Sequence, residues 1–208
     1  MSAQLSKTDL KAIEAKIADV EKHTAGEIVV HVVKRSDDYT AVRLGWSIAL
    51  AAVAVEIFSY AFDDLIYGWT LEMAAGFAFL LWLVLGLPAL LRRVIPMQFT
   101  AEAVHKRAKL AFLENRVYQT RDASGVLIMV SLFERRVEIL ADEGIHARVG
   151  VEGWTKHVRR IIDGMKTGQP AEGIIETIGL IGEDLKSDVP IKPDDENELS
   201  NEVIISDR

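Results

Sequence analysis

Hydrophobic residues concentrate in two long runs near the middle of the chain, residues 42–62 and 73–91. The second run, "MAAGFAFLLWLVLGLPALL", contains no charged residue, and the first contains only Arg43 at its edge and Glu56 inside. A helix needs about 20 mostly apolar residues to cross a bilayer, and both runs reach that length. A helix buried in a soluble core seldom runs this long without a polar stripe. The pattern therefore predicts two membrane-spanning helices joined by a short turn.

The charged residues that flank these runs are distributed unevenly. Lys34 and Arg35 precede the first run, and Arg92 and Arg93 directly follow the second, whereas the turn between the runs carries acidic residues and no lysine or arginine. The positive-inside rule then places both chain ends in the cytoplasm and the turn outside. We therefore expect a multi-pass membrane protein whose soluble domain faces the cytoplasm.

Two alternatives accompany this interpretation. The two runs could be buried helices of a soluble, all-helical core. A small oligomeric channel or transporter subunit is the other alternative, because Glu56 is an ionisable residue inside an apolar run, where charge is costly and often functional. A single such residue without a partner argues against transport, and Glu56 could also extend its carboxylate towards water from the outer end of the span.

Amphipathic and alternating patterns lie on either side of the apolar hairpin. Before it, the spacing of apolar residues predicts a helix within residues 1–23, and residues 24–33 are typical of a strand. After it, the pattern predicts a helix at 100–120 and a β-hairpin with strands at 126–132 and 136–140. An irregular loop is expected at 141–150, followed by a helix at 152–166 and another that begins at Pro170.

These elements predict an α/β fold in which a small β-sheet is sandwiched by helices and interrupted by a two-helix transmembrane hairpin. Residues 1–39 form the first part of the cytoplasmic domain, and residues 99–190 form the second part. Residues 40–98 form the hairpin, with spans at about 42–62 and 73–91. Residues 191–208 form an acidic C-terminal tail, which we expect to be loose or to lie across the domain.

Composition narrows the function classes. Of the 208 residues, 50% are hydrophobic and 26% are charged, which agrees with a very apolar part beside a charged part. The formal net charge of −7 argues against a nucleic-acid partner, because such proteins usually present a basic face. The chain has no cysteine, so disulfides, zinc–thiolate sites and cysteine nucleophiles are excluded. The N-terminal stretch has no apolar core of the kind a secretory signal needs.

Two segments of the predicted soluble part carry a family likeness. The strand "HTAGEIVVHVV" (23–33) and the hairpin "ASGVLIMVSLFERRVEILADEGI" (123–145) resemble the TPM domain, which is found in thylakoid acid-phosphatase-like proteins and in many bacterial membrane proteins. The matching residues are Thr24, Gly26, Ile28, Val29 and Val30, then Gly125 to Ser131, Glu134, Arg135, Val137 and Ile139. Many family members carry the domain outside the membrane behind a signal peptide. Here the apolar hairpin interrupts the domain after its first strand, and the charges place the domain inside. The resemblance to bacterial members implies that the membrane is the bacterial inner (cytoplasmic) membrane.

The resemblance implies two kinds of role. One is a divalent-metal-dependent phosphatase, with calcium or another divalent cation as cofactor. The other is the assembly of membrane proteins, as in photosystem repair and receptor accessory function, with a LemA-type membrane protein as a partner. Enzymatic activity therefore stays open, with the assembly role favoured.

Candidate chemistry is confined to a few acidic residues. The sequence has no nucleophile elbow, no P-loop and no His-Glu-x-x-His motif. Asp142 and Glu143 follow the second strand of the predicted β-hairpin, and Asp122 precedes the first. Because the start of one antiparallel strand lies beside the end of the other, these three residues should be neighbours and could bind a divalent metal. The alternative is a set of solvated loop acids. His146, in the same predicted loop, is either an additional ligand or an exposed side chain.

We therefore expect a membrane-anchored TPM-like protein that binds or assembles a membrane protein partner, with the lipid bilayer itself as its other partner. The metal-dependent phosphatase is the first alternative. An enzyme should collect acids and a base in a pocket, whereas a binding module should present an exposed apolar or charged face.

Overall fold

The computed structural model describes residues 5–61 and 70–207, without the side chains of residues 146–148 and 151. The chain divides into two compact units, which we describe separately. The first, here called the sheet unit, combines Met1–Ser36 with Ala101–Arg208. The second, here called the hairpin unit, is Asp37–Thr100. The expected turn residues Asp63 and Asp64 lie outside the described residues.

The sheet unit is built on a four-stranded mixed sheet with the order β3-β2-β1-β4. Its strands are β1 (Glu27–Val33), β2 (Gly125–Ser131), β3 (Arg136–Ala141) and β4 (Ile204–Ser206). β1 runs parallel to both β2 and β4, whereas β2 and β3 form an antiparallel hairpin. Every residue of β1 and β2 is buried, which explains why neither strand alternates regularly between apolar and polar residues, although β1 also buries Glu27 and His31.

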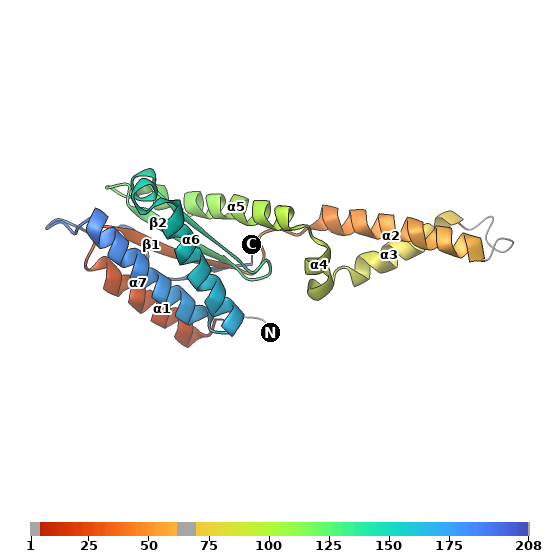
Figure 1. The fold of residues 1–208 in the computed structure, drawn as a ribbon, viewed down its shortest axis with the longest axis horizontal. Coiled ribbons are helices and arrows are strands. Elements are labelled where there is room, and N and C mark those ends of the chain that lie inside the picture. The colour runs from red at the N-terminus through yellow and green to blue at the C-terminus, as the bar shows by residue number, and fades with distance from the viewer. Residues whose placement is uncertain (1–4, 62–69, 208) are drawn as a thin grey trace. The chain divides into compact units, whose positions relative to one another are not determined.

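Helices cover both faces of this sheet. Three helices pack on one face: α1 (Lys7–Glu21), α6 (Glu143–Thr167) and α7 (Pro170–Asp188). On the other face lie α5 (Met97–Glu114) and a short 3₁₀ helix (Val117–Gln119), which contribute small residues such as Ala108 and Ala111 against Leu127 and Met129. Figure 1 shows α1, α6 and α7 on one side of the strands and α5 on the other. The predicted α/β sandwich is confirmed.

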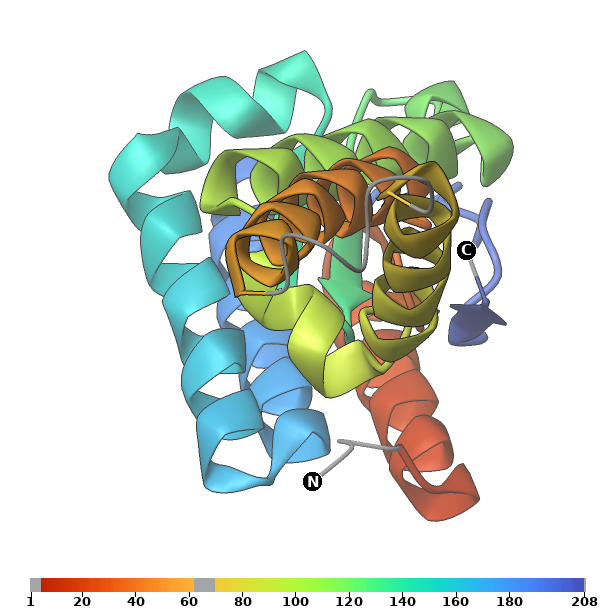
Figure 2. The same ribbon diagram turned by 90° about the vertical axis from the view of Figure 1, so that its right-hand side faces the viewer.

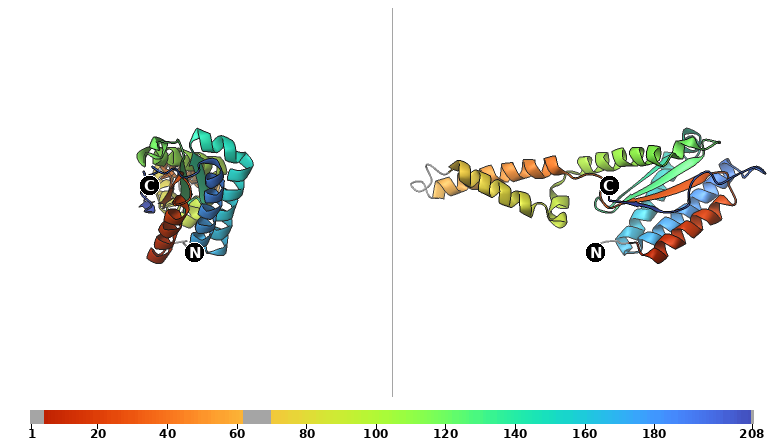
Figure 3. Two further views of the ribbon diagram at one scale, coloured as in Figure 1. Left: turned by 90° about the vertical axis from the view of Figure 1, so that its left-hand side faces the viewer. Right: turned by 180° about the vertical axis from the view of Figure 1, so that it is seen from behind.

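One expectation for the sheet unit is wrong. Residues 143–150 form the first turns of α6 instead of an irregular loop, and Gly150 breaks this helix with a φ of 70°, a conformation that glycine adopts without a steric penalty. Of the two alternatives for the C-terminal tail, the structure agrees with a tail that lies across the domain, because Ile204–Ser206 pair with His31–Val33 as strand β4. The tail runs along the β1 edge of the sheet (Figure 3, right).

The hairpin unit contains α2 (Thr40–Ala61), α3 (Thr70–Val84) and α4 (Pro88–Val94). Figure 2 looks along this unit and shows α2 and α3 side by side. α2 is long and apolar enough to cross a membrane, with a mean hydropathy of 1.7 and only 11% of its most apolar window buried. The second apolar run is long enough to cross a membrane only if α3 and α4 are counted together as one span. The axes of these two helices differ by 104°.

The expectation of one continuous helix over residues 73–91 is therefore wrong. The helix ends near Leu85, and Leu87 adopts an extended conformation with a ψ of 125°. The reason is local, because the ring of Pro88 disfavours the helical conformation in the residue before it. Pro88 then occupies the first turn of α4, where its missing N–H costs nothing.

Candidate functional site

The predicted acidic site lies where the β2–β3 hairpin opens. Asp142 follows β3, and its backbone N–H donates to the Gly125 carbonyl oxygen at 3.0 Å, while the Gly125 N–H donates to its carboxylate at 3.3 Å. Burial raises the pKa of Asp142, against the opposite effect of hydrogen bonds from the Gly125 N–H and the Thr120 hydroxyl. Asp142 is thus part of the hairpin's own hydrogen bonding, and only part of its carboxylate is available to a ligand.

Asp122 lies three residues before β2 and is bound to the C-terminal tail. The ammonium group of Lys192 is 2.6 Å from its carboxylate, and the hydrogen bond from Lys192 lowers the pKa of Asp122. Glu143 is the exposed first residue of α6. In the described part of the chain, no group of three histidines or acidic residues is arranged to hold a metal ion. The metal site at Asp122, Asp142 and Glu143 stays a prediction, and the side chain of His146 lies outside the described set.

Sequence patterns did not reveal a second group of acids, which holds the C-terminal tail. The two carboxylate oxygens of Glu27 accept hydrogen bonds from the backbone N–H groups of Glu198 and Leu199, at 3.1 and 3.2 Å. Glu21 accepts from the Ile28 N–H at 2.9 Å and from the side-chain amide of Asn201 at 2.6 Å. Burial raises the pKa of Glu27, and it raises that of Glu21 to about 8.

A shallow cavity of about 320 Å³ lies between α6 and α7. His157 is buried at its wall, and its Nε2 is 2.8 Å from a carboxylate oxygen of Asp184. Its Nδ1 has no hydrogen-bond partner among the described residues. Lys156 and Ser187 also line this cavity, so it is polar and open to water. The residues that line it do not include the predicted metal ligands.

Two further histidines, His31 and His105, have structural contacts. His31 is buried in β1, where burial lowers its pKa to about 4, so its ring is neutral at physiological pH. Its two ring nitrogens contact Asn115 at 3.4 Å and the Ser206 hydroxyl at 2.9 Å, which links β1 to α5 and β4. His105 pairs with Glu138 of β3 at 2.8 Å.

One residue of the family-like motif has a clear structural role. Glu134, in the turn between β2 and β3, is buried, and its carboxylate accepts hydrogen bonds from the Ser36 N–H at 3.0 Å and from the Ser131 hydroxyl. Arg135 takes up the left-handed turn conformation with a φ of 53°. Glu134 therefore fixes the end of the segment that follows β1, directly before the chain enters the hairpin unit.

Fold and contacts together define an α/β sandwich domain whose first parallel strand connection contains a helical insertion. Residues 93–184 match the family model described as the TPM domain, so the resemblance seen in the sequence is confirmed over this stretch. The NMR structure of the BA42 protein from the psychrophilic bacterium Bizionia argentinensis is similar, with a TM-score of 0.61 at 23% sequence identity. The alignment covers 97% of this chain and 95% of that one, and it shows likeness of fold alone. No curated protein matches the chain.

Proposed function

We propose that this protein is a membrane-anchored TPM-domain protein that binds or assembles a membrane protein partner. The observation that carries the proposal is α2, a 22-residue helix that is apolar all round. It rises about 33 Å, enough to cross a hydrocarbon core of about 30 Å. Its large side chains point outwards, as shown by Ile57, which is 65% exposed. In water such a surface would be unfavourable, whereas a bilayer covers it.

The contrast between anchor and domain supports an assembly role. The sheet unit carries the net acidic tail and the buried carboxylates, while the hairpin unit carries most of the exposed large apolar side chains among the described residues. We place the sheet unit in the cytoplasm, because Arg92 and Arg93 follow the second apolar run, and arginines beside a membrane span favour the cytoplasmic side. A soluble domain held at the membrane in this way is suited to contact a neighbouring membrane protein.

Membrane anchoring is tested by placing charge on α2. Each aspartate at the centre of a spanning helix costs about 3 kcal/mol in insertion, so Val53→Asp with Ile57→Asp should move the full-length chain from the membrane fraction into solution. The matched control is Leu110→Asp with Leu113→Asp, two exposed leucines on α5, which should leave the chain in membranes. If the α2 variant stays in carbonate-washed membranes as the wild type does, the anchoring proposal is wrong.

The partner is tested with a LemA-type membrane protein, which the family resemblance suggests as the first candidate. We expect it to crosslink in membranes to the wild-type chain and to co-purify in detergent, but not with the soluble α2 variant. An unrelated membrane protein of similar size serves as the control. The assembly role is contradicted if neither the LemA-type protein nor any other membrane protein crosslinks to the chain above that control.

A further inference from the structure

The break between α3 and α4 is held in place by a side chain from α2. In an unbroken helix, the Gly86 N–H would donate to the Trp82 carbonyl oxygen, four residues earlier. Here the Gly86 N–H donates to Leu83 at 3.1 Å, and the Trp82 carbonyl accepts instead from the Nε–H of Arg43 at 2.6 Å. Arg43 thus satisfies a carbonyl that the break would leave without a partner, which is the requirement for a helix end in an apolar environment.

Arg43 also packs closely against residues at the break. Its guanidinium lies over the Trp82 ring, 3.8 Å from the ring centre. A Cβ atom at Gly86 would lie only 2.5 Å from the Arg43 Nη2 atom, so a larger residue at this position would displace the end of the Arg43 side chain. The bend of 104° is therefore a packed feature of the hairpin unit, fixed by contacts between α2 and the end of α3.

A second contact attaches the C-terminal end of α4 to α2. The indole N–H of Trp46 donates to the Val94 carbonyl oxygen at 3.1 Å, at the last residue of α4. This carbonyl is one of those that a helix leaves unpaired at its C-terminus. Arg43 and Trp46 both lie in the first turns of α2, so the end of α3 and the end of α4 are attached to the same part of that helix. The arrangement gives α4 a fixed position beside the start of α2.

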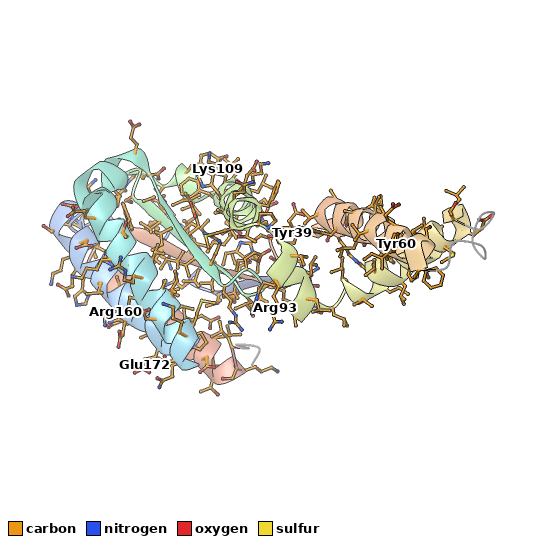
Figure 4. All side chains as sticks on the ribbon, turned by 45° about the vertical axis from the view of Figure 1, so that its right-hand side comes forward. Tyr39, Tyr60, Arg93, Lys109, Arg160 and Glu172 are labelled. Atoms are coloured by element: carbon orange, nitrogen blue, oxygen red, sulfur yellow. The ribbon has the colours of Figure 1, made fainter. Side chains whose placement is uncertain are left out.

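The short α4 is amphipathic. At 100° per residue, its apolar side chains fall on one face and its two arginines on the opposite face. The apolar face consists of Leu90, Leu91 and Val94, and Leu87 directly precedes the helix. Leu91 is buried with 1% exposed, Leu87 is 56% exposed, and Arg92 and Arg93 are both exposed. Arg93 and Tyr39 lie at one end of the hairpin unit, and Tyr60 lies towards the other (Figure 4).

We propose that α4 lies on the membrane surface as an interfacial helix, where Arg92 and Arg93 bind the phosphate groups of anionic lipids, and that α3 alone makes the second membrane crossing. This inference rests on the proposed membrane anchoring through α2. A helix with a charged face and an apolar face lies in the interface, with the apolar face towards the acyl chains. Guanidinium groups suit lipid phosphates because they form paired, charge-assisted hydrogen bonds. Trp46 and Trp82 lie at the same end of the unit, where tryptophans favour the interface.

The depth of α4 in the membrane can be measured directly, because the chain has no cysteine and accepts a single labelled one. We would place spin labels at Leu87, Ala89 and Val94, and at Val53 on α2, in the full-length chain in vesicles containing one third phosphatidylglycerol. We expect Val53→Cys to be deep in the bilayer, Leu87→Cys and Val94→Cys to share a shallow interfacial depth, and Ala89→Cys to be exposed to water.

The outcomes separate the two proposals. If depth changes steadily from Leu87 to Val94 by about 1.5 Å per residue, α4 continues a span and the interfacial position is wrong. If Val53→Cys is as accessible to water as Ala89→Cys, the membrane anchor itself is wrong. The expected pattern, with a deep Val53 and a shallow α4, supports both.

Lipid recognition needs a separate measurement. We would compare binding of spin-labelled phosphatidylglycerol and phosphatidylcholine to the reconstituted chain. Removing one arginine near an anionic surface weakens the interaction about fivefold. Arg92→Gln with Arg93→Gln should therefore reduce the preference for phosphatidylglycerol at least fivefold, whereas Arg159→Gln with Arg160→Gln on α6 should not. An unchanged preference in the first variant, or an equal loss in both, would overturn the headgroup role.

Discussion

The sheet unit and the hairpin unit use the same apolar residue types for opposite purposes. Ile128 of β2 is fully buried between two layers of helices, whereas Ile57 of α2 is 65% exposed. The sheet unit excludes water from its own side chains, and the hairpin unit offers its side chains to the surroundings. The comparison shows that apolar content alone does not define a protein core, because the surroundings decide whether an apolar surface is stable.

The largest expected effect tests this comparison with the same substitution, isoleucine to alanine, in each of the two units. Ile128→Ala removes a fully buried side chain and should reduce the free energy of unfolding of the sheet unit by about 2–4 kcal/mol. Ile57→Ala removes an exposed side chain and should change the free energy of unfolding of the sheet unit by less than about 0.5 kcal/mol. Native-state hydrogen exchange of the β1 and β2 amides, in detergent-solubilised full chain, measures both. Equal effects would mean that the two units do not differ in packing as described.

Sequence patterns predicted the sheet unit better than the hairpin unit. The β2–β3 hairpin follows from local alternation and a polar turn, so its strands were placed within one residue. The break before α4 had a signal in "GLPALL", since proline restricts the residue before it, but the long apolar run favoured a continuous helix. Strand β4 could not be predicted, because three residues gain their structure only from pairing with β1.

The candidate site was predictable only in part, for a similar reason. Antiparallel pairing correctly placed Asp142 at the start of β2, where it bonds to Gly125. The partner of Asp122 is Lys192, which is 70 residues away in sequence. Glu27 likewise binds the backbone of Glu198 and Leu199 across more than 170 residues. Such contacts depend on where the tail lies, and no local pattern contains that information.

A smaller effect concerns the pH dependence of stability, and it tests the contact between Glu21 and the C-terminal tail. The pKa of Glu21 is raised from about 4.5 to about 8, so the folded state holds its proton more tightly than the unfolded chain. Stability from this group is therefore complete below about pH 4.5 and is lost as pH rises towards 8, by at most about 1.4 kcal/mol per pH unit. Glu21→Gln should remove this slope and stabilise the sheet unit at neutral pH.

The control for this prediction is Glu183→Gln, an exposed acid on α7, which should leave the pH profile as in the wild type. Hydrogen exchange at pH 5 to 8 would show the slope, after correction for the intrinsic exchange rate. If stability of the wild-type sheet unit rises across this range and Glu21→Gln makes no difference, Glu21 is ionised in the folded protein.

The smallest expected effect tests the predicted metal site. Calcium should bind the acidic residues Asp122, Asp142 and Glu143 and shift the amide signals of their neighbours. At a calcium concentration equal to the dissociation constant, the stabilisation is only about 0.4 kcal/mol. Lys192→Gln should strengthen binding because it frees the Asp122 carboxylate, and Asp142→Asn should weaken it. Signals that stay unchanged up to millimolar calcium in all three chains would contradict the site.

The position of the hairpin unit in the chain has a consequence for synthesis. β1 and β2 are paired neighbours, yet about ninety residues separate them, including all of the hairpin unit. At a translation rate of 5–20 residues per second, β1 waits roughly 5–20 seconds for its partner strand. During that interval the whole hairpin unit is synthesised. The order of the chain thus makes pairing of β1 with β2, and closure of the sheet unit, a step that follows synthesis of the hairpin unit.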